Sequence, residues 1–120
     1  MELLGLVFAG TATPRRDAMV EFVQTMLGLQ RIAVDSETAD MFALPDGARF
    51  AVADERDEGR GTSRSIGFLV ADLAAAVAEL RAAGVPVDEP AANDRHFYAH
   101  FTAPDGELYE LVQERSDAVP

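Results

Sequence analysis

Apolar and polar positions follow the same order of patterns in both halves of the chain. Each half begins with an apolar run typical of a buried strand, at residues 3–10 and 64–71. Each run is followed by apolar residues at helical spacing, which predicts helices within 13–28 and 72–84. A further strand comes next, predicted at LQRIAVDS (29–36) in the first half and more weakly at GVPVDEP (84–90) in the second. A hairpin follows, so each half is predicted as a strand, a helix and three strands.

Each predicted helix carries signals for its ends and for its buried face. Thr13 and Asp72 are expected to cap the first turns, and Gly28 and Gly84 are expected to end the helices. The apolar positions then form one stripe on each helix. The expected stripes are Met19, Phe22, Val23 and Met26 in the first helix, and Leu73, Val77 and Leu80 in the second.

The two hairpin segments are related by an internal repeat. FALPDGARFAVADE (42–55) and FTAPDGELYELVQE (101–114) align without gaps, and five of the fourteen positions are identical. Both contain Pro-Asp-Gly, which combines a preset φ, a side chain that bonds its own backbone and a residue tolerant of positive φ. Each segment is therefore predicted as strand, turn and strand.

The repeat predicts a single domain, residues 1–120, with an α+β fold of two βαβββ modules. The modules are expected at about 3–54 and 64–114, with the charged, glycine-containing stretch 55–63 as a linker. One module cannot bury both faces of its sheet, so the two are expected to form one cupped mixed sheet with the helices outside. An apolar-lined cavity between modules is a common place for a ligand.

Charge and composition exclude several classes of function. The net charge of −11 disfavours nucleic acid and anionic membranes as partners, because both require a basic surface. The chain has no cysteine and no lysine, so thiolate metal sites and Schiff-base chemistry are excluded. No apolar run approaches the roughly 20 residues of a membrane span, and the first residues make a poor signal peptide, so a cytoplasmic protein is predicted.

Three segments resemble the vicinal oxygen chelate superfamily, also called the glyoxalase/bleomycin resistance protein/dioxygenase superfamily. They are FVQTMLGL (22–29), SIGFLVADLAAAVAELRAAGV (65–85) and FTAPDGELYEL (101–111). The resemblance implies the glyoxalase/bleomycin resistance fold and a small-molecule ligand. It does not select a reaction, because the family includes isomerases, dioxygenases, epimerases and drug-binding proteins.

The resemblance also implies which positions would hold the metal of the metal-using members. Glu110 matches one ligand position, whereas Ala51 and Ser65 occupy two others, and the fourth falls on Leu6 or Phe8. One protein carboxylate would hold a divalent ion only weakly. No metal and no cofactor are therefore expected, and the family's metal-dependent activities are disfavoured.

Strand alternation, placed by the family's pattern, predicts the residues that line the ligand site. The predicted ligand-binding residues are Phe8, Ala51, Ser65, Gly67, Leu69, His96, Tyr98, His100 and Glu110. His100 and Glu110 are expected on neighbouring strands, where a hydrogen bond would raise the pKa of the histidine. Two interpretations remain open for this pair: an acid–base or ligand-orienting couple, or a polar pair that satisfies its own hydrogen bonds.

Two main hypotheses for function follow. The first is a metal-independent, homodimeric protein that binds or sequesters an antibiotic or another aromatic metabolite, with His100 and Glu110 orienting it. The second is a lyase or isomerase of the same fold that uses His100 and Glu110 as general acid and base. A third, a metal-dependent member with displaced ligands, is weaker. The sequence does not decide whether the protein is an enzyme.

Overall fold

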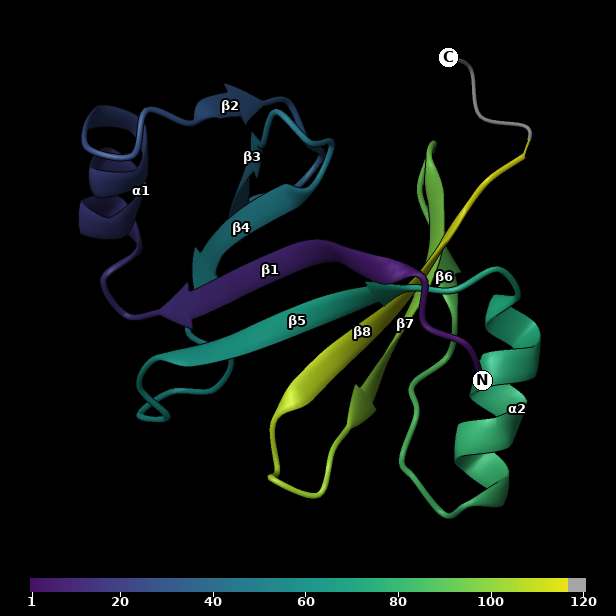
Figure 1. Cartoon of the computed structure of the whole chain (residues 1–120). Helices are drawn as coiled ribbons and strands as arrows, with labels where there is room; N and C mark the ends of the chain where they lie inside the picture. Colours follow the sequence, from purple (N-terminus) through teal and green to yellow (C-terminus); the bar gives the residue numbers. More distant parts are fainter. Residues whose placement is uncertain (117–120) are drawn as a thin grey trace. The chain divides into compact units, whose positions relative to one another are not determined.

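In the computed structural model, which describes residues 1–116, the chain divides into two compact units (Figure 1). One contains residues 8–65, and the other contains residues 1–7 with the chain from Ile66 onward. The first seven residues group with the second unit because the Leu4 amide donates to the Leu69 carbonyl (2.8 Å). Neither described helix is long and apolar enough to cross a membrane.

The unit of residues 8–65 contains a four-stranded mixed sheet and one helix. The sheet order is β2-β3-β4-β1, in which β1 and β4 run parallel and the other neighbours run antiparallel. The elements are β1 (Gly5–Thr13), α1 (Arg16–Thr25), β2 (Gln30–Ile32), β3 (Ala39–Ala43) and β4 (Arg49–Asp54). This is the predicted order of strand, helix and three strands, with β2 shorter than expected.

The core of this unit forms where α1 packs on the sheet. Val23, Phe42 and Val52 are completely buried there. The predicted stripe of α1 is wrong at two positions, because Phe22 is 46% exposed and Met26 is 72% exposed. Met19 and Val20 pack against the core together with Val23, so two predicted positions are correct and the buried face includes Val20 in place of Phe22.

The first turn of α1 also differs from the prediction. The helix begins at Arg16, its N-cap residue is Arg15, and no side chain caps it. Thr13 is instead the last residue of β1, and its hydroxyl accepts a hydrogen bond from the Arg15 amide (3.1 Å). Thr13 therefore stabilises the turn before the helix rather than the helix end.

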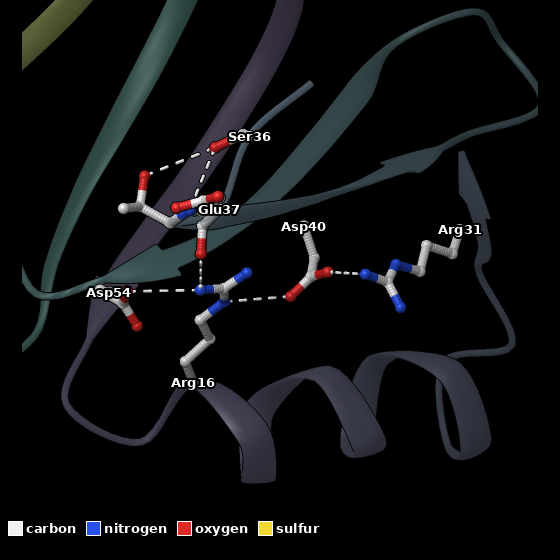
Figure 2. A network of polar contacts seen from close by, with 7 residues as sticks. Arg16, Arg31, Ser36, Glu37, Asp40 and Asp54 are labelled. Atoms are coloured by element: carbon white, nitrogen blue, oxygen red, sulfur yellow. Dashed lines mark hydrogen bonds and ion pairs between the residues drawn. The ribbon is translucent and has the colours of Figure 1, made fainter. Parts of the chain in front are cut away.

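An ionic network around the buried Asp40 connects the start of α1 to the sheet (Figure 2). The side chain of Asp40 is only 8% exposed and accepts from Arg16 Nε (3.0 Å) and from Arg31. Arg16 Nη1 also donates to the Glu37 carbonyl (2.9 Å) and to Asp54 (3.3 Å). These contacts connect α1 with β2, β3 and β4, which are far apart in the sequence.

The second unit repeats the same order of elements (Figure 1). Its strand order is β5-β8-β7-β6, with β5 parallel to β8 and the remaining neighbours antiparallel. Its elements are β5 (Ser63–Leu69), α2 (Leu73–Ala82), β6 (Ala91–Ala92), β7 (His96–Thr102) and β8 (Leu108–Glu114). Both halves therefore have the βαβββ order that the sequence predicts. The boundary between the units crosses two strands, so residues 5–7 of β1 belong to the second unit and residues 63–65 of β5 belong to the unit of residues 8–65.

Helix α2 follows its sequence signals closely. Asp72 is the N-cap residue, and its carboxylate accepts from the Ala75 amide (3.0 Å), as predicted. Leu73 and Val77 are buried against β7 and β8, and Gly84 follows the helix with a φ of 81°. The predicted stripe is correct here because the helix packs on its sheet with that face.

The two Pro-Asp-Gly turns are built in the same way, as the repeat predicts. Asp46 accepts from the amide two residues later (2.9 Å), and Asp105 does the same (3.0 Å). Gly47 and Gly106 follow with φ of 91° and 81°, which disfavours any side chain at these positions. Each turn therefore sets the register of its hairpin.

The segment between α2 and β7 is less regular than expected. The strand predicted within residues 84–90 consists of a single bridge between Val87 and Phe101, and β6 lies further along at Ala91–Ala92. Pro86 and Pro90 have no N–H to donate, so a continuous ladder cannot form there. The segment nevertheless follows β7, because the Asp88 amide donates to the His100 carbonyl (3.0 Å).

Candidate functional site

The sheet of the second unit brings three predicted site residues into one row. Gly67 on β5 pairs with Glu110 on β8, and Glu110 pairs with His100 on β7. Directly paired residues project their side chains from the same face of a sheet. Glu110 thus lies between a residue without a side chain and a histidine.

A second row lies beside the first. Leu69 pairs with Val112, and Val112 pairs with Tyr98, so the aromatic ring and two aliphatic side chains are neighbours. The Tyr98 ring meets the His100 ring edge to face, with centroids 6.0 Å apart. We call the residues of these two rows the site face; His96 lies two residues from Tyr98 along β7, opposite Glu114.

The His100 imidazole lies between two carboxylates. Its Nε2 is 3.2 Å from Glu110 Oε2, and its Nδ1 is 3.1 Å from Asp88 Oδ2. Glu110 is the more buried partner, with 12% of its side chain exposed, whereas Asp88 is 53% exposed. The contact between His100 and Glu110 that strand alternation predicts is present, and a second carboxylate joins it.

The surroundings of His100 favour its charged form. The pKa of His100 is raised above its usual value, chiefly because its ring donates to Glu110; burial opposes this, and the negative charges of Glu110 and Asp88 add to it. Two acidic side chains and one histidine form this group, so acidic groups outnumber basic ones in it. The group can accept a hydrogen bond or bind a cation through the remaining carboxylate oxygens.

This raised pKa gives the stability a pH dependence of definite sign. Because the pKa of His100 is higher in the folded chain, its contribution is fully present below the unfolded pKa of about 6.5 and is lost as the pH rises through the folded pKa. We expect His100→Gln to lower the free energy of unfolding, relative to the wild type, by more at about pH 5.5 than at about pH 9. Urea denaturation of both proteins measures this, and a loss that grows with pH would contradict the raised pKa.

Asp88 is the site residue that the sequence analysis missed. It lies in the segment GVPVDEP, which is predicted only as a weak strand and has no partner strand assigned. Its approach to His100 depends on the bridge between Val87 and Phe101. An acidic residue between two prolines is the only local signal, and it does not indicate a partner.

Three predicted site residues belong to the other unit, where they surround Gly10. Ala51 pairs with Gly10 across β1 and β4. A Cβ atom on Gly10 would lie 3.1 Å from the Phe8 ring and 3.1 Å from the Ser65 hydroxyl. Phe8 and Ser65 therefore pack over Gly10, and this group consists of a ring, a methyl group and a hydroxyl.

Comparison with known proteins assigns the chain to a family. Residues 6–111 match the Glyoxalase/Bleomycin resistance protein/Dioxygenase superfamily, so the chain belongs to this superfamily. No protein of curated function matches it significantly. The family prediction from the three sequence segments is confirmed.

Solved structures with the same fold include two epimerases. Methylmalonyl-CoA epimerase from Mycobacterium tuberculosis is 21% identical with a TM-score of 0.72, covering 94% of this chain and 89% of that one. The Streptomyces coelicolor methylmalonyl-CoA epimerase, solved with 2-nitronate-propionyl-CoA, is 25% identical with a TM-score of 0.71, covering 96% and 100%. Protein BH1468 from Bacillus halodurans is 18% identical with a TM-score of 0.72, covering 97% and 98%. These matches confirm the predicted fold class.

The residues of this chain do not fit the metal of the metal-using family members. Within residues 1–116, no group of three or more His, Asp and Glu side chains is arranged to hold an ion. Ala51 offers a methyl group, and both ring nitrogens of His100 already contact carboxylates. A metal ligand needs a free nitrogen lone pair, so His100 would have to leave one partner to bind an ion.

Proposed function

We propose that this protein binds a small molecule without a metal, and that Glu110, held by His100, is the main polar contact. The observation that carries the proposal is the row of Gly67, Glu110 and His100. Glu110 has a positioned carboxylate beside a residue that has no side chain. Burying a carboxylate is costly in free energy unless the group is paired and hydrogen-bonded, as Glu110 is with His100.

The charge of the site face supports a particular class of ligand. One imidazolium and two carboxylates leave an excess negative charge, and the whole chain carries −11. Such a group favours a ligand with a cationic or hydrogen-bond-donating group. Tyr98 adds an aromatic surface, so a small aromatic molecule with an amino group suits the face best.

The finer parts of the proposal follow the family resemblance. The ligand is an aromatic metabolite or an antibiotic, which the protein binds or sequesters in the cytoplasm. Phe8, Ala51 and Ser65, around Gly10 in the other unit, remain predicted ligand-binding residues. The protein is a homodimer, which light scattering after size-exclusion chromatography tests directly.

A binding screen with a matched substitution tests this proposal. Benzylamine and tyramine serve as cationic aromatic probes, benzyl alcohol as a neutral one, and zinc and magnesium as metal probes. Thermal shift and calorimetry are expected to show binding of a cationic probe and no stabilisation by either metal. If every aromatic probe fails, or a metal alone stabilises the protein, the proposal is wrong.

Glu110→Gln is expected to weaken binding of the cationic probe about tenfold to a hundredfold, because it removes a charged hydrogen-bond acceptor at constant volume. Glu114→Gln is the control, since it removes the same charge from the exposed end of the same strand. Calorimetry of the three proteins measures the difference. Equal affinities for the Glu110 variant and the wild type would exclude Glu110 as the main contact.

A second candidate function is a lyase or isomerase that uses the same couple. It is supported by the similarity to structures of epimerases and by the hydrogen bond between His100 and Glu110. Glu110 would take a proton from an acidic carbon and return one to that carbon, and His100 would hold the Glu110 side chain in place through their hydrogen bond. Methylmalonyl-CoA incubated with the protein in deuterated water tests this: deuterium at the acidic carbon supports an enzyme, and a probe recovered unchanged supports a binding protein.

A further inference from the structure

Asp88 contacts His100 through both its backbone and its side chain. Asp88 Oδ1 accepts from the His100 amide (2.7 Å), and Oδ2 lies 3.1 Å from His100 Nδ1. The Asp88 amide donates to the His100 carbonyl (3.0 Å). One residue therefore fixes both the backbone and the ring of the histidine.

The segment that carries Asp88 is itself held in place. The Arg81 guanidinium, from the last turn of α2, donates to the carbonyls of Val87 (3.4 Å) and Asp88 (3.2 Å). On the other side, the Thr102 amide donates to the Pro86 carbonyl (3.0 Å). Asp88 is thus presented to β7 from a segment fixed at both sides.

The contact with Asp88 selects one orientation of the His100 ring. With Nδ1 directed to Asp88, Nε2 is directed to Glu110. Rotating the ring by half a turn would place carbon atoms against both carboxylates and lose both hydrogen bonds. A hydrogen bond at one ring nitrogen commonly determines whether the other nitrogen is protonated or binds a metal.

The charged groups around His100 are few and come from separate elements. Glu110 approaches from β8 and Asp88 from the segment before β6, while Tyr98 meets the ring edge-on from β7. Arg81 from α2 contacts backbone carbonyls and Glu89. Two carboxylates therefore act on the ring directly, and both favour its protonated form.

We propose that Asp88 is a positioning residue of the site face: it fixes the His100 ring so that Nε2 faces Glu110 and holds the Glu110 side chain in place. This rests on the proposed function as far as the ligand is concerned. Asp88 contacts Nδ1, whereas Glu110 contacts Nε2, so Asp88 does not have to touch the ligand. Its action on His100 can be measured without any ligand.

The test compares Asp88→Asn with Glu89→Gln in ligand-free protein. Glu89 is the matched control, because it is the adjacent carboxylate, is almost fully exposed and contacts Arg81 rather than His100. Proton–nitrogen correlation spectra of the imidazoles, recorded from about pH 5 to about pH 10, give the titration midpoint and protonation state of each ring. The chain has two histidines, so His96 is an internal reference.

We expect Asp88→Asn to shift the His100 midpoint downward, whereas His96 keeps its midpoint and Glu89→Gln changes neither ring. An unchanged midpoint and ring state of His100 in Asp88→Asn would overturn the proposal. If this variant does not fold, the wild type decides: at about pH 5.5, below the unperturbed pKa of about 6.5, both His100 ring protons must be observed in hydrogen-bonded positions. Absence of the Nδ1 proton would overturn it.

Binding of benzylamine separates this inference from the proposed function. If benzylamine binds the wild type and Asp88→Asn weakens it several-fold, with Glu89→Gln unchanged, both stand. If no probe binds but the His100 midpoint shifts as expected, the proposed function fails and the action of Asp88 on His100 is retained. If the probe binds both variants as tightly as the wild type, Asp88 has no positioning role.

Discussion

Phe42→Ala is expected to lower the free energy of unfolding by about 3–5 kcal/mol, the largest effect of any substitution considered. Phe42 is completely buried in the core that α1 and β4 share, together with Val23 and Val52. Truncation removes the apolar contacts of a ring and leaves a cavity that the surrounding strands can only partly fill. Urea denaturation followed by circular dichroism measures the change.

Phe22→Ala is the matched control for this prediction. It removes the same side chain from the same unit, but Phe22 is largely exposed on α1. We expect Phe22→Ala to lower the free energy of unfolding by about 1 kcal/mol or less, because little buried apolar area is lost. Equal losses for Phe22 and Phe42 would contradict the position of the core.

Asp40→Ala is expected to lower the free energy of unfolding by about 3 kcal/mol, the second largest effect. The substitution removes the carboxylate between Arg16 and Arg31 and leaves Arg16, whose side chain is mostly buried, with fewer compensating contacts (Figure 2). Breaking a buried pair by removing one partner is costly because the remaining charge is no longer balanced. Denaturation by urea again gives the free energy.

Glu37→Ala tests whether this loss comes from the ionic network. Glu37 contributes only its backbone carbonyl to Arg16, so truncating its exposed side chain leaves that hydrogen bond in place. We expect the free energy of unfolding of Glu37→Ala to stay within about 0.5 kcal/mol of the wild-type value. A small effect of Asp40→Ala, comparable with that of Glu37→Ala, would show that the network adds little to stability.

Much of the candidate site follows from local rules. Strand alternation, placed by the pattern of the resembling family, predicts His100 and Glu110 on one face, because the period of a strand is two residues. The repeated Pro-Asp-Gly turn then sets the register of β7 against β8, which brings the two side chains opposite each other. Whether these residues bind a ligand remains a prediction.

Asp88 could not be placed in this way. The segment around it forms only one bridge with β7, so no period or register connects it to His100 in the sequence. Its position results from Arg81 on α2 and from the bridge at Val87. These contacts exist only when helix and sheet have packed together.

The βαβββ order, the cap at Asp72 and the two hairpin turns can be read from the sequence because each depends on residues at most a few positions apart. The buried face of α1 and the network around Asp40 cannot, since they depend on how a helix meets strands that follow it much later in the chain. A helix with apolar residues on more than one side has no local reason to bury Val20 rather than Phe22. Packing against Phe42 and Val52 makes that choice, and the same kind of long-range contact brings Asp88 to His100.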